Sequence, residues 1–357
     1  MTLGLFLVAG QFPGTTHTDT LASAVRYAAE AERVGLHGVW LAEHHFIRYG
    51  VCPSAVAFAG FLLGHTSRIE VGTAACVLSA RHPVALAEET ALLDQLSGGR
   101  FRLGVARGGP WLELEVLGTG LARYTRGFAE SLDLTLRWLE SDRVGATGEF
   151  FTFRAATVVP RPLTRPRPPV WVAATGVATV DLAASRGVPL LLGVHQDDAG
   201  KAALLDRYAR VAAAHGHDPA LVPHAGVVLV QVTDDPAETV ALLRGSMSAW
   251  TGLGLRDYLR VDGSVSPSRA PLEYVDHLLR IHPVGPADHC AEQLARTIRR
   301  TGIRRLLLMV EGTGDIRKTM RNINRIGTQV LPLLDRCRIP SDGGRLRVGG
   351  RGGAGRR

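Results

Sequence analysis

Two histidines and a glutamate stand together in this sequence, directly after a short apolar stretch. Glu43, His44 and His45 follow residues 39–42, which Gly38 and polar residues bracket as in a buried strand. Polar groups just past such a strand lie at the mouth of a parallel sheet, where α/β proteins place their chemistry. Histidine can exchange protons near neutral pH, but histidine pairs at strand ends also serve as hydrogen-bonded structural features. This stretch alone therefore leaves a catalytic and a structural interpretation open.

A second group of residues could hold an anion. Arg107 is a fixed cation next to two glycines that permit close approach, and Thr175, Gly176 and Thr179 stand where another helix begins. Free backbone N–H groups and the local dipole let a helix amino terminus bind phosphate, and threonine hydroxyls add donors. Either threonine could instead simply cap the helix. Together with Arg107, the pattern indicates a phosphate-bearing ligand across a site that also holds His44.

Other kinds of chemistry find little support. The sequence has no HExxH motif, no carboxylate pair at metal-bridging spacing and no Gly-x-Ser-x-Gly elbow. We therefore expect no metal site and no serine-triad hydrolysis. The cysteines are scattered without CxxC or zinc-finger spacing and fit reduced thiols of a cytoplasmic protein: Cys52, Cys76, Cys290 and Cys337.

The elements that must position these residues alternate between short apolar strands and amphipathic helices, which indicates a series of βαβ units. We expect strands at residues 3–8, 39–42, 69–78, 101–105, 170–173, 189–193, 225–232 and 304–310. Helices are expected at residues 19–35, 54–64, 83–96, 124–139, 174–187, 199–215, 236–250, 287–301 and 316–334. Eight strand–helix units without a separating linker predict a (β/α)8 TIM barrel, with a doubly wound open sheet as the second choice.

Three segments interrupt or follow the series. Residues 149–159 alternate like a small β-hairpin, and residues 252–283 are rich in Gly, Ser and Pro without a clear period. A loop that long inside a compact domain is usually functional or disordered, so it predicts a long insertion or lid before strand eight. We expect one domain at residues 1–336, followed by a disordered Gly/Arg-rich tail at residues 337–357.

Composition narrows the class of protein. Of 357 residues, 46% are hydrophobic, enough for a large core, and no apolar run is long enough to span a membrane. Much of the net charge of +8 comes from five arginines of the tail, set against one aspartate after residue 340. Without interleaved aromatic residues, that tail fits a solvated terminus better than a nucleic-acid-binding segment. No basic segment precedes the first strand, so we expect no signal peptide and a cytoplasmic location.

Several motifs of this sequence occur in the same order and at similar spacing as in a known protein family. The chain resembles the bacterial luciferase-like flavin monooxygenases over about residues 1–336, with an order and spacing most similar to luciferase α subunits. The motifs are Trp40-Leu41-Ala42-Glu43-His44-His45-Phe46, Val71-Gly72-Thr73-Ala74-Ala75, His82-Pro83-Val84, Leu92-Leu93-Asp94-Gln95-Leu96-Ser97, Gly99-Arg100-Phe101-Arg102 and Pro283-Val284-Gly285.

The resemblance implies a two-component monooxygenase. A separate flavin reductase would supply reduced FMN, and O2 would add to the flavin as a 4a-hydroperoxide that hydroxylates or Baeyer–Villiger oxidises a small organic substrate. His44 matches the family's catalytic histidine, Arg107 the arginine that holds the FMN phosphate, and Thr179 a hydroxyl on that phosphate. Ala74-Ala75 matches a non-proline cis peptide beneath the flavin ring. Residues 252–283 match a mobile lid, whose closure excludes water.

Three departures from the luciferase pattern bear on the site. Ala106 stands in place of a reactive cysteine, and Thr175 and Gly176 replace an acidic residue and a serine of the phosphate loop. Val194 replaces a tryptophan of the substrate pocket, which argues against light emission from a long-chain aldehyde. We expect Val194, His195 and Trp250 to line the substrate pocket, although Trp250 could equally be a core residue of its helix.

Two alternative functions remain open. One is a deazaflavin-dependent oxidoreductase on the same fold, whose acidic cofactor would need more basic residues than Arg107 and Arg81. The other is a non-catalytic flavin-binding partner subunit, against which the retention of His44 beside Glu43 argues. The small and apolar residues of the helices at 54–64 and 83–96 also predict a homodimer, as in the family, with a heterodimer as an alternative.

Overall fold

The chain forms a closed barrel of parallel strands surrounded by helices. The computed structural model describes residues 1–264 and 270–336. The barrel strands are β1 (Thr2–Leu7), β2 (Gly38–Leu41), β3 (Glu70–Thr73) with β4 (Cys76–Val77), β5 (Phe101–Ala106), β8 (Val170–Ala174), β9 (Leu190–Leu192), β10 (Ala225–Leu229) and β13 (Arg305–Met309). Each strand pairs with its neighbour in parallel, β13 pairs with β1, and β3 pairs with β5. The predicted TIM barrel is confirmed, and the open sheet is wrong.

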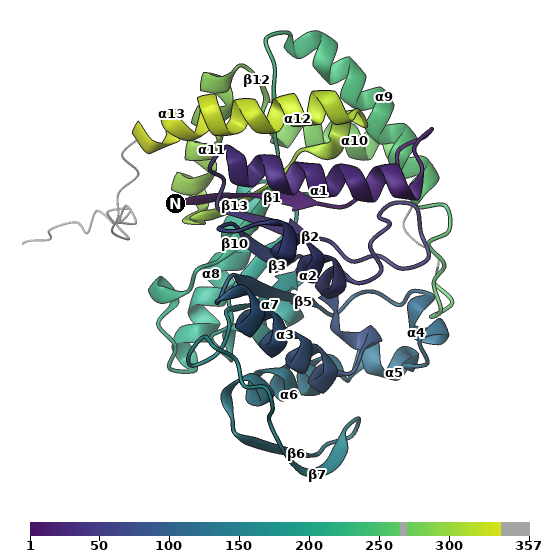
Figure 1. Cartoon of the computed structure of the whole chain (residues 1–357), viewed down its shortest axis with the longest axis vertical. Helices are drawn as coiled ribbons and strands as arrows, with labels where there is room; N and C mark the ends of the chain where they lie inside the picture. Colours follow the sequence, from purple (N-terminus) through teal and green to yellow (C-terminus); the bar gives the residue numbers. More distant parts are fainter. Residues whose placement is uncertain (265–269, 337–357) are drawn as a thin grey trace, which may run out of the picture.

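Helices cover the outside of the barrel (Figure 1). They are α1 (His17–Arg33), α2 (Ala55–His65), α3 (Pro83–Ser97), α4 (Glu113–Val116), α5 (Gly120–Thr125), α6 (Phe128–Glu140), α7 (Val177–Ala184), α8 (Asp198–Ala214), α9 (Pro236–Gly254), α10 (Pro271–Ile281), α11 (Ala287–Thr301), α12 (Ile316–Arg325) and α13 (Leu331–Arg336). Two short pairs lie outside the barrel: β6 (Arg143–Thr147) with β7 (Thr152–Thr157), and β11 (Gln231–Val232) with β12 (Val284–Gly285). None of the described helices has an apolar stretch long enough to cross a lipid bilayer.

Local sequence signals explain where these helices begin. Thr16 and Asp19 form a reciprocal capping box at the start of α1, and α3 begins with Pro83 after a histidine cap. The barrel interior is filled by large side chains, among them Trp40 and Trp171, whose rings meet edge to face at 5.0 Å. A larger apolar layer between strands and helices completes the core.

Several expected elements have different bounds. The expected strand at 69–78 is interrupted at Ala74-Ala75, and the one at 225–232 is divided into β10 and β11. The expected helix at 124–139 is divided at residues 126–127, where α5 ends and α6 begins; a Cβ at Gly127 would lie 2.9 Å from the Arg123 carbonyl oxygen. The hairpin is confirmed, but its first strand begins at Arg143, where Val144 and Ala146 are buried against the helical layer.

The long insertion, whose residues 265–269 lie outside the described part of the chain, contains more helix than expected. Helix α9 continues to Gly254, and α10 occupies Pro271–Ile281. Proline at the first helical position and the buried Val275 and Leu278 three residues apart are the signals that the pattern analysis missed. The predicted tail at 337–357 lies outside the described residues, as does Cys337.

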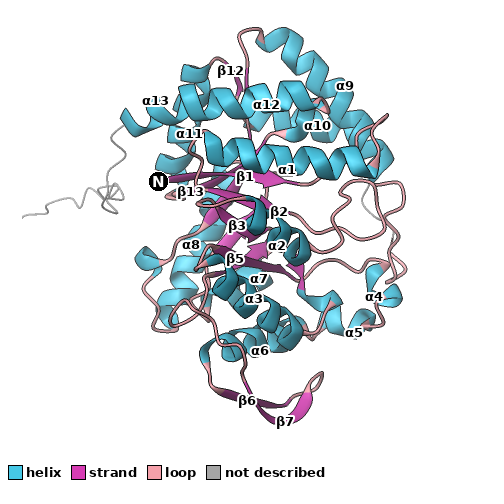
Figure 2. Cartoon of the chain, viewed as in Figure 1, coloured by secondary structure: helices cyan, strands magenta, loops and turns pink. Residues whose placement is uncertain are grey.

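The carboxyl ends of the barrel strands face one end of the molecule. The amino terminus of β1 lies at the left of Figure 1, and the long loops collect at the opposite end (Figure 2). The segments that follow β2, β5 and β8 all belong to that end, so the sequence motifs with polar residues share one face of the barrel.

Candidate active site

The order of the barrel strands arranges the expected site residues as an arc. His44 follows β2, Ala74-Ala75 follow β3, Arg107 follows β5, and Thr175 follows β8. These strands are consecutive neighbours around the barrel. The register pairs Val105 with Val172, so Arg107 and Thr175 leave adjacent strand ends. The structure therefore brings the histidine, the expected cis peptide and the expected phosphate residues to one continuous side of the barrel mouth.

Glu43 is buried and holds two backbone segments together through hydrogen bonds. Its two carboxylate oxygens accept hydrogen bonds from the Ala55 N–H at 3.0 Å and the Val77 N–H at 2.9 Å. They thereby join the start of α2 to β4. His45 Nε2 lies 3.7 Å from the same carboxylate. Although burial opposes ionisation, His45, Arg81 and these N–H groups keep the pKa of Glu43 below its usual value. Its geometry gives Glu43 a positioning role.

His44 is half-buried and lies next to Glu43 in the chain. Burial lowers the pKa of its imidazole to about 4, despite the opposing effect of Glu43. Its Nδ1 is buried without a hydrogen-bond partner among the described residues. Its ring meets the Tyr49 ring edge to face at 5.1 Å. The imidazole is therefore neutral at physiological pH and retains a nitrogen that can accept a proton.

Trp250 is part of a packed aromatic stack at the barrel mouth. It is fully buried, with Tyr49 stacked on it at 4.5 Å and Phe12 at 5.0 Å. Its indole N–H donates to the Tyr49 carbonyl at 3.0 Å. Because no side of the ring is open to solvent, the core interpretation of Trp250 fits this structure better than a pocket wall.

The peptide bond between Ala74 and Ala75 is cis, which confirms this structural feature of the resemblance. Beside it, the fully buried Thr73 hydroxyl donates to the Gly104 carbonyl at 2.8 Å and accepts from the Gly104 N–H at 2.9 Å. A Cβ at Gly104 would collide with the Thr73 carbonyl oxygen, so only glycine permits this approach. Thr73 thus links β3 to β5 where their backbone pairing stops.

Arg107 has an unneutralised guanidinium group. Within the described residues, no carboxylate forms an ion pair with it, and its contact is with the Tyr124 ring, at 4.7 Å from the ring centre. The Ser79 hydroxyl holds the Arg107 backbone by donating to its carbonyl. Arg81, by contrast, lies 3.5 Å from Glu89. The backbone of Arg107 is therefore held in place, and its guanidinium group has no carboxylate partner among the described residues.

The start of α7 has free backbone donors. Gly176 is the N-cap residue and no side chain caps the helix, so the alternative in which Thr175 or Thr179 caps it is not the one this structure has. A Cβ at Gly176 would meet no other atom within 4 Å. The space beside Gly176 is thus open, and the first N–H groups of α7 have no side-chain cap at the end of the strand next to Arg107.

The expected pocket residues Val194 and His195 are held from outside by α10 and the residue after it. His282 Nε2 bonds the Val194 carbonyl at 2.7 Å, and His277 Nε2 bonds the His195 carbonyl at 2.9 Å. Burial lowers the pKa of His282 to about 3, so its neutral ring donates this bond. The insertion therefore fixes the backbone of the segment after β9.

A short antiparallel bridge connects the insertion to the segment after β5. The Leu112 N–H donates to the Leu259 carbonyl at 3.1 Å, and the Val261 N–H donates to the Pro110 carbonyl at 2.8 Å. The Trp111 ring meets Tyr258 edge to face at 3.9 Å. The insertion and the Arg107 segment are thus joined along a shared edge.

The sequence analysis did not identify Thr73, Tyr49, His282 or Glu311 as site residues. Glu311 lies two residues past the end of β13, so the strand-end rule that selected the other residues would also have selected it. Tyr49 and His282 carry no such signal, because their partners are distant in sequence. Among residues 1–264 and 270–336, no cluster of three or more His, Cys, Asp or Glu is arranged to hold a metal ion.

This fold and this arc of residues can be compared with known proteins. The family model described as luciferase-like monooxygenase matches residues 1–305. The chain is 27% identical over 355 residues to the alkanal monooxygenase alpha chain of the Kryptophanaron alfredi symbiont, covering 94% of this chain and 98% of that one. It is 26% identical to the alkanal monooxygenase beta chain of Photobacterium leiognathi, covering 92% and 99%. The chain belongs to the luciferase-like monooxygenase family, and it is an oxidoreductase of the flavin-dependent monooxygenase class.

Solved structures agree on the fold. The monooxygenase RslO1 from Streptomyces bottropensis superposes with a TM-score of 0.81 at 22% identity, covering 93% of this chain and 99% of that one. An F420-dependent secondary alcohol dehydrogenase with an F420-acetone adduct gives 0.75 at 20% identity, covering 93% and 98%. The oxygenating constituent of 3,6-diketocamphane monooxygenase from Pseudomonas putida, in complex with FMN, gives 0.74 at 20%, with the same coverages.

Proposed function

We propose that the protein is a monooxygenase that uses reduced FMN from a separate reductase, with O2 as co-substrate, to oxidise a small organic molecule. The observation that carries this proposal is the arc at the barrel mouth, with a neutral histidine at one end and an open cation beside free helix donors at the other. Family membership and the FMN complex of a protein with the same fold support it.

The residues at the mouth fit a flavin phosphate. Arg107 lacks a carboxylate partner among the described residues, and the first N–H groups of α7 have no side-chain cap. A phosphate between these adjacent strand ends would receive charge-assisted hydrogen bonds from both sides, and Thr175 and Thr179 would add hydroxyls. The Ala74-Ala75 peptide, between this end of the arc and His44, would then lie under the flavin ring.

Bound reduced flavin supplies the two electrons that O2 activation requires. In this arrangement His44 acts as the base, because its imidazole is neutral at physiological pH and so has a nitrogen that can accept a proton. Glu43 holds His45 and the start of α2, and so fixes the backbone that carries His44. The aromatic stack on Trp250 and the bridge between 110–112 and 259–261 exclude water from that side of the mouth.

The experiment that tests the proposal is an anaerobic titration of the purified protein with reduced FMN, followed by stopped-flow mixing with oxygenated buffer. The proposal expects tight binding and a transient absorbance to the blue of oxidised flavin before the oxidised spectrum appears. The candidate substrate should be present in a parallel series. Binding without any transient in either series would favour a non-catalytic flavin-binding subunit.

The second candidate is a deazaflavin-dependent oxidoreductase. The fold shared with the F420-dependent alcohol dehydrogenase supports it. The acidic F420 cofactor would need several basic residues, of which the sequence offered Arg107 and Arg81. Because Arg81 is paired with Glu89, Arg107 is the one of these two arginines without a carboxylate partner in the described part of the chain, which argues against this candidate. Absence of FMN binding, together with binding of reduced F420 in the same titration, would replace the first proposal by this one.

We also infer that two copies pair through α2 and α3, the assembly predicted from the sequence. Large apolar side chains are exposed on these helices, with Phe61 at 51%, Leu92 at 47% and Leu96 at 76%. Light scattering should report a dimer that Leu96→Glu dissociates. The matched control is Leu221→Glu, because Leu221 is 80% exposed but far along the chain from these helices. A monomeric wild type would refute this pairing, and would leave a related partner chain as the alternative.

A further inference from the structure

A buried carboxylate lies at the end of the last barrel strand, outside the proposed cofactor arc. Glu311 is 5% exposed, and its Oε2 accepts a hydrogen bond from the Val8 N–H at 2.6 Å. Burial raises the pKa of Glu311 to about 7, and the backbone N–H groups of residues 8–10 partly oppose that rise. This acid therefore anchors the segment that leaves β1.

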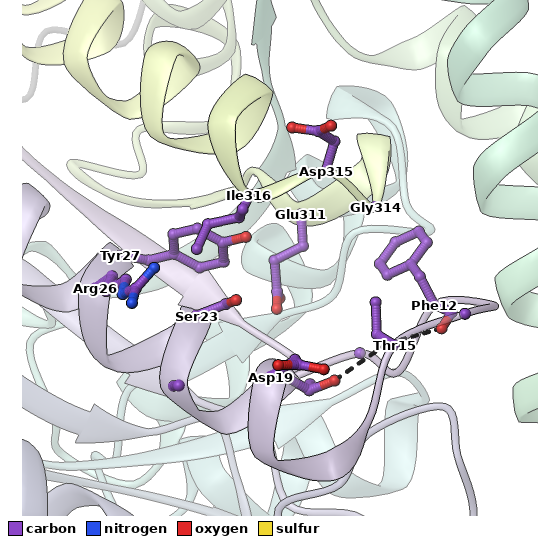
Figure 3. Close-up of a pocket in the computed structure, with 14 residues that line it drawn as sticks. Phe12, Thr15, Asp19, Ser23, Arg26, Tyr27, Glu311, Gly314, Asp315 and Ile316 are labelled. Carbon is purple, nitrogen blue, oxygen red and sulfur yellow. Dashed lines mark hydrogen bonds between the residues drawn. The ribbon is translucent and has the colours of Figure 1, made fainter.

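A cavity gives solvent a route to this carboxylate. It has a volume of about 380 Å³ and opens between α1 and the segment before α12. In Figure 3 the Glu311 side chain extends toward α1, with Tyr27 and Ser23 on one side and Phe12 on the other. Asp19 and Arg26 are exposed lining residues. Solvent can thus approach Glu311 through this cavity.

The segment held by Glu311 is packed against the loop that carries His44. Ala9 has φ of +52°, and its carbonyl accepts from the Val51 N–H at 3.0 Å. At Gly50, a Cβ would lie 2.6 Å from His44 Nδ1 and 2.7 Å from the Val8 carbonyl oxygen. Gly50 therefore lies between the turn at residues 8–10 and the imidazole, with no room for a side chain.

We propose that Glu311 is a positioning residue for His44: its carboxylate fixes the turn at residues 8–10, and that turn fixes the loop 44–51. The fixing of the turn and the loop is inferred from contacts alone. The importance of this positioning for catalysis by His44 rests on the proposed function. No step of the reaction passes through Glu311 itself. The Trp250 indole packs against the same turn, because a Cβ at Gly10 would lie 2.8 Å from it. The Tyr49 ring stacks on this indole.

Ionisation of Glu311 sets the strength of this anchor. Because burial raises this pKa despite the N–H groups, the closed turn favours the neutral carboxyl, whereas opening to water favours the carboxylate. The turn should therefore open more readily as pH rises through about 7. The ionisable groups facing Glu311 are Asp19, Arg26 and Tyr27 from α1, Asp315 before α12, and Tyr49 from the loop. The pKa of Asp19 lies below its usual value, and those of Tyr27 and Tyr49 lie above theirs. None of these three groups changes charge near neutral pH.

Amide hydrogen exchange in the flavin-free protein tests the anchor without requiring activity. In Glu311→Gln, which keeps an acceptor oxygen but cannot ionise, the amides of residues 8–11 and 44–51 should exchange within about threefold of wild type at about pH 6 and about tenfold more slowly than wild type at about pH 8. The control is Asp315→Asn, which lines the same cavity and keeps an N-cap acceptor for α12. It should leave both segments unchanged.

Wild type alone provides a second measurement in case Glu311→Gln does not fold. Protection of residues 8–11, relative to amides of α3, should fall as pH rises through about 7. Flat relative protection, or equal effects of both variants, would overturn the anchor. In single-turnover flavin oxidation, Glu311→Gln should remove an inflection near pH 7 while Asp315→Asn keeps it. A changed exchange pattern without flavin binding would refute the proposed function and leave the anchor standing.

Discussion

Replacing Thr73 by valine should destabilise the barrel next to the Ala74-Ala75 peptide. The substitution keeps the shape of the side chain but removes a hydroxyl that bonds both backbone groups of Gly104, at 2.8 and 2.9 Å. Both groups then stay buried without partners, and each such loss costs about 1–3 kcal/mol. The total of about 2–6 kcal/mol is a large share of the stability of a typical domain, about 5–15 kcal/mol. With an unfolding entropy of about 2.1 cal/mol/K per residue, the melting temperature should fall by about 3–8 °C.

Thr90→Val is the matched control for this prediction. Thr90 is also fully buried, but its hydroxyl donates to the Leu86 carbonyl, which α3 already satisfies through its own backbone. That variant should lose less than about 1 kcal/mol. Urea unfolding followed by circular dichroism measures both variants, and a flavin titration of folded Thr73→Val should show weaker binding. Equal losses in the two variants would show that the Thr73 hydroxyl does not hold β3 to β5, and the reasoning would fail.

Three further predictions concern the site and its titration. Arg107→Ala should weaken FMN binding about 10- to 100-fold while riboflavin binding changes less than about twofold, and Arg126→Ala should affect neither; equal losses for both flavins would exclude a phosphate role. His44→Ala should slow oxygenation by about 10²- to 10⁴-fold with flavin affinity nearly unchanged, so full activity would remove it from the mechanism. Burial lowers the pKa of His44 and His224 to about 4 and that of His282 to about 3, so each takes up a proton on unfolding. The urea midpoint should therefore fall as pH drops from about 6.5 to about 4, and a constant midpoint would contradict this.

The barrel could be predicted because its signals are local. Each strand is a short apolar run next to an amphipathic helix, and the bounds of α11 were obtained without error. The errors arose where tertiary contacts override local pattern. β3 and β4 separate at Ala74-Ala75 because the Thr73 side chain replaces backbone pairing there, and no periodicity reports such an exchange. The insertion escaped detection because two buried residues in a short helix are a weak signal beside many Gly, Ser and Pro residues.

For the candidate site, the positions of residues at strand ends could be predicted from sequence, but their hydrogen-bond partners could not. The strand-end rule selects His44, Arg107 and Thr175 from sequence alone, because parallel strands bring their carboxyl ends together. The rule cannot reveal that the Glu43 oxygens accept hydrogen bonds from the Ala55 and Val77 N–H groups, because these partners depend on how α2 and β4 pack. The flavin roles of these residues remain predictions.

The pairing of the last barrel strand with the first has a consequence for synthesis on the ribosome. β1 lies between β2 and β13, and the Val8–Glu311 hydrogen bond joins residues 303 positions apart. At about 5–20 residues per second, the ribosome needs about 15–60 s to supply this partner after β1 is made. During that interval one edge of β1 has unpaired backbone groups, which are open to strands of other nascent chains. We therefore expect the yield of folded protein in cells to depend on translation speed and on chaperones that bind nascent chains.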